Sequence, residues 1–217
     1  MSLAVQEERH MTHVFARAIA IGALVLGFGP SIYAQNGVPF GPDLPAVPGN
    51  LVVDEGFALF FKAHAIGTQN YLCAPAANGF AWRQIEPQAT LFQTFRDDLS
   101  QQLATHFLSA NPDEDGLPRA TWQHSFDSSR VWARMLRFST DGTYVQPGAI
   151  PWFLLVTVGK AEGPTGGGVL AQTAYIQRLN TSGGAPPSTG CALATHVGAF
   201  ALVPYSADYF FYRKSQG

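Results

Sequence analysis

Apolar and polar residues alternate along most of the chain, in short segments that are separated by turn residues. In the segment 57–65, for example, Leu59 and Phe61 fall on one face of an extended strand, whereas Lys62 and His64 fall on the other. Alternation of this kind is typical of β-strands that have one buried face. The pattern therefore predicts a chain built mainly from strands.

Turn residues divide the chain into about ten such strands. We expect one hairpin to turn at Gly67, and we expect Pro87 to interrupt the chain between two further strands. No alternation of strands with long helices is present, so the sequence predicts an all-β domain, an antiparallel β-sandwich or flattened barrel. The expected strands cover residues 57–65, 68–73, 80–85, 89–95, 121–126, 130–138, 150–158, 169–179, 196–205 and 208–213.

One segment has helical spacing instead. Between Asp97 and Phe107, the apolar residues Leu99 and Leu103 recur at intervals of four, in step with Phe107. Asp97 or Asp98 supplies a side chain that can cap the first turn. The sequence therefore predicts one short helix here.

The N-terminal segment has the features of a secretory signal. Arg17 precedes an apolar run, Ala18–Phe28, and Ala34 is a small residue suited to a cleavage site. The signal begins at Met1 or at Met11. The run is too short to span a bilayer, so we expect no membrane span after cleavage and an exported, periplasmic or extracellular protein. The expected organisation is a signal peptide at 1–34, a linker rich in Pro and Gly at 35–50 and a single β domain at 51–217.

Composition excludes one class of partner. Charged residues make up 13% of the chain, hydrophobic residues 47%, and the formal net charge is −2. A protein that neutralises phosphates needs a basic stripe, so we expect no nucleic-acid partner. We also find no cofactor motif and expect no cofactor, and the sequence sets no oligomeric state.

Two cysteines, Cys73 and Cys191, follow the expected cleavage site. In an exported domain they most simply form one disulfide, with a reactive thiol pair or metal ligands as the alternatives. The bond would fasten the loop rich in Gly and Pro that precedes Cys191. We expect this loop to form the wall of any functional site.

Six stretches of the chain match the sequence pattern of a known protein family. They are Leu59–Cys73, Thr105–Phe107, Pro147–Leu155, Thr173–Gly184, Thr189–Cys191 and Val203–Phe211. In these stretches the chain resembles a family of secreted bacterial and fungal proteins, catalogued as domain of unknown function number 3455. The resemblance covers about Pro45–Tyr212 and implies a secreted globular domain, without an established activity. The segment Leu108–Arg137 departs from the family because its acidic loop is longer; Trp122 matches the Trp that follows this loop in the family.

Some fungal members of that family carry a dehydrogenase label. In this chain, Gly166-Gly167-Gly168 lacks the G-x-G-x-x-G spacing of a dinucleotide loop and does not open a helix after a strand. The sequence therefore does not support that label.

Histidines are the first candidates for chemistry. His64, His106, His124 and His196 lie on separate predicted elements and form no short ligand motif. They can converge as metal ligands, or they are scattered structural residues. His106 is the first candidate for a catalytic residue, because it lies in the Thr-His-Phe stretch that matches the family, and His64 is the second.

Three more residues are candidates for ligand binding. Arg178 precedes the Gly- and Pro-rich loop, and its guanidinium can bond loop carbonyls, pair with a carboxylate such as Asp208, or bind an anion. Trp122 and Tyr175 can belong to an aromatic surface for a flat ligand, or to the core.

Two functional hypotheses follow. The first is a non-catalytic, exported domain that binds a small molecule or a cell-surface component. The alternative is an extracytoplasmic enzyme that depends on a metal or on histidine, a hydrolase or a redox enzyme. The chain contains no G-x-S-x-G nucleophile motif, and whether it is an enzyme stays open at this point.

Overall fold

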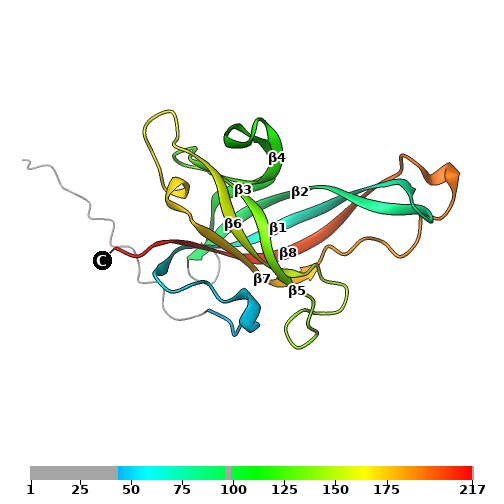
Figure 1. Cartoon of the computed structure of the whole chain (residues 1–217), viewed down its shortest axis with the longest axis horizontal. Helices are drawn as coiled ribbons and strands as arrows, with labels where there is room; N and C mark the ends of the chain where they lie inside the picture. Colours follow the sequence, from blue (N-terminus) through cyan, green and yellow to red (C-terminus); the bar gives the residue numbers. More distant parts are fainter. Residues whose placement is uncertain (1–43, 96–98, 217) are drawn as a thin grey trace, which may run out of the picture. The chain divides into compact units, whose positions relative to one another are not determined.

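Within residues 44–95 and 99–216, the part of the chain that the computed structural model describes, eight antiparallel strands close into one barrel (Figure 1). Each strand pairs with the next along the chain, and the last pairs with the first. The predicted all-β, antiparallel fold is confirmed. The sequence left a sandwich or a flattened barrel open, and the structure is a closed barrel. The strands are β1 (Phe57–Ala76), β2 (Gly79–Phe95), β3 (Leu99–Asn111), β4 (Leu117–His124), β5 (Arg130–Ser139), β6 (Trp152–Ala161), β7 (Tyr175–Gly183) and β8 (Phe200–Lys214).

Short 3-10 helices interrupt the connections between the strands. They are η1 (Gly49–Leu51), η2 (Pro112–Glu114), η3 (Leu170–Gln172) and η4 (Ala194–His196). No helix in the described part of the chain is long and apolar enough to cross a membrane. The expected signal peptide at 1–34 and the first part of the expected linker, 35–43, lie outside the described residues.

Our prediction that the chain turns in a hairpin at Gly67 is wrong. Gly67 lies inside β1, opposite Ala89 of β2 and Tyr205 of β8. A Cβ atom at this position would overlap the carbonyl oxygen of Gln88. Glycine is therefore needed here because two strands approach each other closely, and not because the chain turns.

Our prediction that Pro87 interrupts the chain between two strands is wrong too. β2 runs through Pro87, which lies opposite Gln69 of β1. The register between β2 and β3 begins at the pair Ala89 and His106, so β2 is an edge strand at Pro87, where proline is tolerated. Beyond this pair β2 and β3 separate, which leaves a gap in the barrel wall.

The short helix predicted between Asp97 and Phe107 is wrong as well. From Leu99 onward this segment is strand β3, which pairs with β2 on one side and with β4 on the other. Asp97 lies outside the described residues. In this strand Leu103, Ala104 and His106 are buried, whereas Phe107 is only half-buried, so burial does not follow the spacing of four. Pairing on both sides outweighs the local helical spacing.

Side chains of the strands form two apolar layers. On β8, Tyr209 and Phe211 belong to the cluster that fills the barrel, whereas Phe210 and Tyr212 belong to a second cluster. Because side chains alternate along a strand, this second layer lies on the outer face. β6 and β7 alternate in the same way, so both faces of this part of the wall are buried.

The segment before β1 covers the outer layer. Leu51 in η1 is fully buried in that cluster. Its carbonyl oxygen accepts a hydrogen bond of 2.7 Å from Nε2 of Gln177, and Oε1 of Gln177 accepts one of 2.6 Å from the hydroxyl of Tyr212. The buried amide is thereby satisfied on both sides and holds the segment against β7 and β8.

β1, β2 and the first part of β8 extend together beyond the other strands, toward the right of Figure 1. We call this extension, residues 68–76, 79–88 and 200–206, the arm. The loop from Gly184 to Ala199 runs along it, and a disulfide joins Cys73 to Cys191. The predicted disulfide is confirmed. The indole N–H of Trp82 donates a hydrogen bond of 2.9 Å to the carbonyl oxygen of Thr189 and adds a second tie.

The disulfide leads to a first prediction. The two cysteines are 118 positions apart, and a cross-link of that span restricts the unfolded chain strongly. We expect the double variant Cys73→Ser/Cys191→Ser to lose about 3–5 kcal/mol of unfolding free energy in urea denaturation. Reduction of the unaltered protein serves as the control and should give a similar loss. A double variant as stable as the unaltered, oxidised protein would contradict this role.

Candidate functional site

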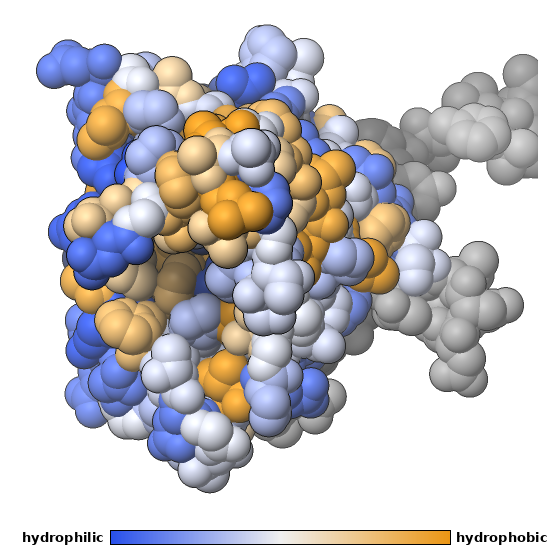
Figure 2. Space-filling view, turned by 90° about the vertical axis from the view of Figure 1, so that its right-hand side faces the viewer, coloured by the Kyte–Doolittle hydropathy of each residue, from blue (hydrophilic) through white to orange (hydrophobic). Residues whose placement is uncertain are grey.

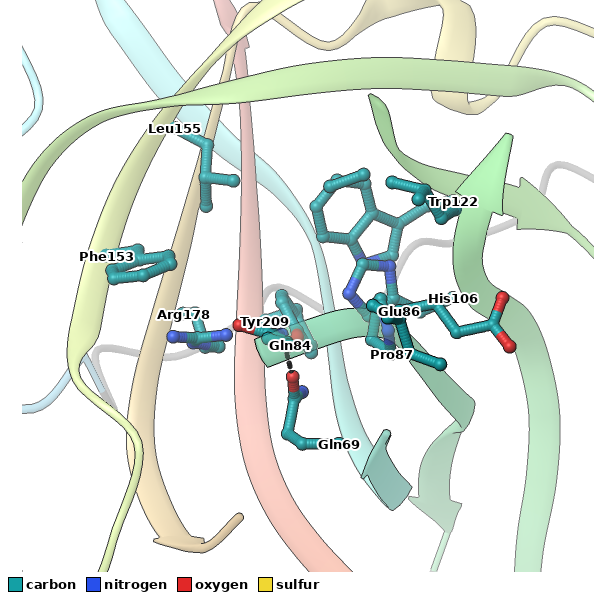
Figure 3. Close-up of a pocket in the computed structure, with 13 residues that line it drawn as sticks. Gln69, Gln84, Glu86, Pro87, His106, Trp122, Phe153, Leu155, Arg178 and Tyr209 are labelled. Atoms are coloured by element: carbon teal, nitrogen blue, oxygen red, sulfur yellow. Dashed lines mark hydrogen bonds between the residues drawn. The ribbon is translucent and has the colours of Figure 1, made fainter. Parts of the chain in front are cut away.

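A cavity of about 200 Å³ lies inside the barrel. Ile85 and Pro87 of β2 and Leu108 of β3 line it, so it borders the gap where these two strands separate. The face of the molecule seen from the side of the arm mixes hydrophobic and hydrophilic residues and is hollowed left of its centre (Figure 2). The other lining residues are Gln69, Gln84, Glu86, His106, Ala120, Trp122, Phe153, Leu155, Arg178 and Tyr209 (Figure 3).

One wall of the cavity is aromatic. His106 and Trp122 are cross-strand partners on β3 and β4, and their rings stack with centroids 4.2 Å apart and planes 8° from parallel. The ring of Tyr209 meets both of them edge-on, at 5.3 and 5.4 Å. These side chains fix one another, because directly opposed residues of an antiparallel pair lie close enough for ring contact.

His106 is neutral at physiological pH. Its Nδ1 donates a hydrogen bond of 2.9 Å to the carbonyl oxygen of Thr121. A carbonyl can only accept, so the proton lies on Nδ1, and Nε2 is left as an acceptor. Burial lowers the pKa of His106 from 6.5 to about 3, and the nearby charge of Arg178 adds to the effect. Such an imidazole is a weak base at neutral pH.

Arg178 of β7 is also buried, with 7% of its surface exposed. Its guanidinium stacks on the ring of Phe153, at 3.9 Å, and its Nε and Nη2 donate to the carbonyl oxygen of Pro151, at 3.2 and 2.8 Å. The expected bond to a loop carbonyl is thus present, on the loop that enters β6. Pairing of Arg178 with Asp208, the other interpretation, is wrong because Asp208 pairs with His64.

Two hydrogen-bond donors of the lining have no partner within the described residues. They are the indole Nε1 of Trp122 and the amide Nε2 of Gln69, both buried. Oε1 of Gln69 accepts a hydrogen bond from Gln84, so the amide is oriented. Buried donors without acceptors are rare in folded proteins and call for an explanation.

His64 and His196 lie away from this cavity. On the outer face, His64 donates from Nδ1 to Asp208, at 2.7 Å, and this hydrogen bond raises its pKa above the ordinary value of 6.5. His196 lies in η4, where its Nδ1 accepts the backbone N–H of Ala192 at 3.2 Å. The structure therefore does not bring these two histidines to His106.

Tyr175 lies outside the cavity too. Its hydroxyl donates to Asp54, at 3.2 Å, and its ring meets Phe57 edge-on at 4.8 Å, in the outer layer. Of the three residues proposed to bind a ligand, Trp122 and Arg178 line the cavity and Tyr175 does not. The Gly- and Pro-rich loop before Cys191, which we expected to form the wall of a site, does not contribute to the lining of this cavity.

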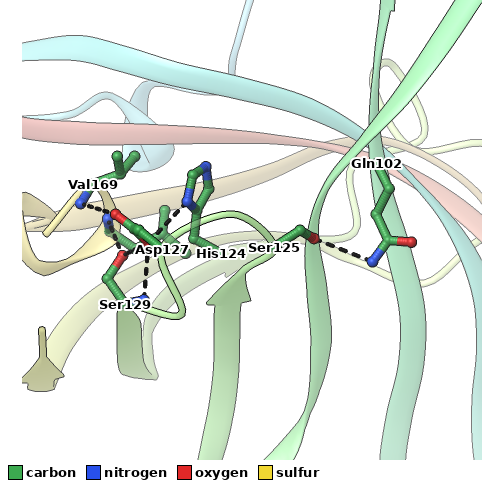
Figure 4. A network of polar contacts seen from close by, with 7 residues as sticks. Gln102, His124, Ser125, Asp127, Ser129 and Val169 are labelled. Carbon is green, nitrogen blue, oxygen red and sulfur yellow. Dashed lines mark hydrogen bonds and ion pairs between the residues drawn. The ribbon is translucent and has the colours of Figure 1, made fainter. Parts of the chain in front are cut away.

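His124 takes part in a separate network around Asp127 (Figure 4). Oδ1 of Asp127 accepts from Nδ1 of His124 at 2.8 Å and from the hydroxyl of Ser129 at 2.7 Å, and Oδ2 accepts the N–H of Val169 at 3.0 Å. Burial opposes ionisation of Asp127, but the hydrogen bonds from Val169 and Ser129 outweigh it and hold the pKa at about 2. The serine donates to the carboxylate and not to the imidazole, so this is not a nucleophilic triad.

The four candidate histidines therefore lie in four separate settings. Within residues 44–95 and 99–216, no group of three or more His, Cys, Asp or Glu side chains is arranged to hold a metal ion.

The cavity also uses residues that the sequence did not single out. Gln69 continues the inward-facing series of Phe61, Ala63 and Ala65 on β1, and Tyr209 belongs to the inward series of β8. A polar residue in phase with an apolar face is the signal that would have identified Gln69.

Comparison with protein families gives one match. The family model described as Protein of unknown function (DUF3455) matches residues 55–213, which include every lining residue of the cavity. Comparison with curated proteins and with solved structures finds no match.

The buried state of His106 gives a second prediction. In an NMR titration of the imidazole signals, we expect His106 to remain neutral, with its proton on Nδ1, until the pH falls to about 3. His64 is the internal control, since we expect it to titrate above 6.5. Protonation of His106 near pH 6.5 would show that its environment is not the buried one described.

The network around Asp127 gives a third prediction. The folded pKa of Asp127, about 2, lies below the ordinary 3.8, so its stabilising contribution is complete above pH 4 and is lost as the pH falls through 2. We expect Asp127→Asn to lower the unfolding free energy by about 1–3 kcal/mol at pH 7, with a smaller difference below pH 3. The exposed Asp115→Asn is the control. Equal effects of the two substitutions in urea denaturation would rule out the network as a source of stability.

Proposed function

The chain belongs to the DUF3455 family of proteins of unknown function, and we propose that it is a binding protein whose barrel holds a small ligand beside Trp122 and His106. The observation that carries this proposal is the internal cavity, which combines an aromatic wall with buried polar side chains. Pockets for small molecules have this composition, a mainly apolar lining with a few polar groups that orient the ligand.

The unsatisfied donors of the lining favour a ligand over a purely structural role. A core that serves stability alone fills its volume with apolar side chains and leaves few polar groups unpaired. Here, Nε1 of Trp122 and Nε2 of Gln69 lack acceptors within the described residues, and both belong to the lining of the cavity. A ligand with acceptor atoms could bond these donors and so remove the free-energy cost of burying them without a partner.

The size of the cavity limits the ligand. An apolar cavity of about 150 Å³ accommodates a benzene molecule, and the cavity here measures about 200 Å³. One ring with a short substituent therefore fits. Trp122, His106 and Tyr209 offer faces and edges for such a ring. A small molecule suits this interior better than a large cell-surface component does.

Two observations make binding a better proposal than hydrolysis. His106 borders the cavity, but its pKa of about 3 makes it a poor general base at neutral pH. The hydroxyl of Ser129 is bonded to Asp127 and to the backbone N–H of Leu170, and not to an imidazole. Neither arrangement activates a nucleophile.

We further propose that the protein acts outside the cytoplasm. The disulfide between Cys73 and Cys191 supports this, because such bonds persist in oxidising compartments. The predicted signal sequence at the N-terminus supports it as well.

The proposed function gives a fourth prediction. Ala120 lines the cavity, so Ala120→Leu should reduce its volume, whereas Ala58→Leu, on an exposed position of β1, should leave it unchanged. We expect small aromatic compounds of one ring to shift the indole N–H signal of Trp122 in NMR spectra. Ala120→Leu should weaken this binding about tenfold or more, and Ala58→Leu should not.

Two results would contradict the proposal. In the first, no compound from a diverse set of one-ring molecules shifts the indole N–H signal of Trp122. The other is equal binding by the Ala120→Leu and Ala58→Leu variants, which would place the compounds elsewhere on the protein.

A further inference from the structure

The positive charge of Arg178 lies inside the barrel and has no counter-ion among the residues that the structure describes. Both donors with assigned partners, Nε and Nη2, bond the neutral carbonyl oxygen of Pro151. Among residues 44–95 and 99–216, the ion pairs within 4.0 Å involve other side chains, and none includes Arg178. A guanidinium carries five N–H donors and no acceptor, so only an acceptor group can pair with it.

The surroundings of this charge are neutral. Phe153 lies under the guanidinium, at 3.9 Å, and His106 and Tyr209, which both sense its field, are uncharged at pH 7. Burying a charge without a partner of opposite sign costs several kcal/mol in a typical protein interior. The stacking on Phe153 and the bonds to Pro151 offset part of this cost and leave the charge uncompensated.

Two further donors of the lining also lack an acceptor within the described residues. Nε1 of Trp122 and Nε2 of Gln69 can only donate, and each lacks an acceptor within the described residues. Together with the guanidinium they form a set of donors around one space. Such a set suits a group that offers several acceptor lone pairs and a negative charge, as a carboxylate does.

Glu86 is the one acidic side chain of the lining. It is half-buried, and its Oε1 accepts a long hydrogen bond of 3.4 Å from Gln88. In Figure 3 its carboxylate lies on the opposite side of the view from Arg178 and points away from it. Glu86 therefore does not neutralise Arg178.

We propose that the cavity binds a small organic carboxylate that carries one flat, apolar ring. The carboxylate binds the guanidinium of Arg178, and the ring lies beside Trp122 and Tyr209. This inference rests on the proposed binding function and adds the chemical class of the ligand. Charge selects the carboxylate, and the volume of about 200 Å³ limits the rest to about one ring.

The test compares charged and neutral ligands of equal size by isothermal titration calorimetry. Benzoate and phenylacetate are the charged probes, and benzyl alcohol and 2-phenylethanol are the neutral ones. We expect the carboxylates to bind about tenfold tighter or more, as hydrogen bonds to charged groups are stronger than neutral ones. Inorganic phosphate, which has no ring, should not compete at equal concentration.

A pair of matched variants assigns the preference to one side chain. Arg178→Met should abolish the preference for carboxylates while retaining the binding of the alcohols. Arg213→Met is the control, because Arg213 also lies over an aromatic ring, that of Phe60 at 5.4 Å, and does not line the cavity. If Arg178→Met does not fold, the Nε–H signal of Arg178 in NMR spectra of the unaltered protein replaces it. Benzoate should shift this signal, and benzyl alcohol should not.

The outcomes separate this inference from the proposed function. Equal affinity for acids and alcohols, or a preference for acids that survives Arg178→Met, would overturn the carboxylate assignment and leave a binding protein for neutral ligands. An Nε–H signal that does not respond to bound benzoate would do the same. If none of the acids and alcohols binds, the proposed function fails together with the inference.

Discussion

The pairing of β1 with β8 is the interaction on which the rest of the structure depends. It extends from the pair Phe57 and Lys214 to the pair Leu72 and Phe200, so it covers the wall of the barrel and continues along the arm. Without this closure β1 and β8 would be open edges, and the residues that now face inward would lie on one side of an open sheet. An interior, and therefore a cavity, exists only because the first and last strands meet.

The same long strands explain why β2 and β3 of the closed barrel are paired over only part of their length. β1 and β2 stay paired far beyond the point at which β2 leaves β3, and Gly67 lets them cross closely there. Past the pair Ala89 and His106, the inner faces of β2 and β3 are no longer held together. The gap lies next to the stacked pair of His106 and Trp122, so the departure of β2 toward the arm gives the aromatic wall its access.

The alternation of apolar residues was sufficient to predict an antiparallel all-β fold, and the cysteines were sufficient to predict their bond. Turns were harder, because Gly67 and Pro87 have uses inside strands that local sequence does not distinguish from a turn. Parts of the site followed from residue type, as with Trp122 and Arg178. Tyr175 could not be told from these residues by sequence, because the wall formed by β6, β7 and β8 is buried on both faces and alternation alone does not tell the inner face from the outer. That distinction depends on strand pairings between residues far apart in the chain.

Arg178 and Gln177 are neighbours on β7, and they show how the two buried faces of this wall differ. Outward-facing Gln177 of β7 lies under the segment around Leu51, and its amide has hydrogen-bond partners on both sides. Inward-facing Arg178 is equally enclosed, yet its charge has no counter-ion within the described residues. The unpaired donors of Trp122 and Gln69, which line the same cavity as Arg178, are therefore the observation that supports the proposed binding site.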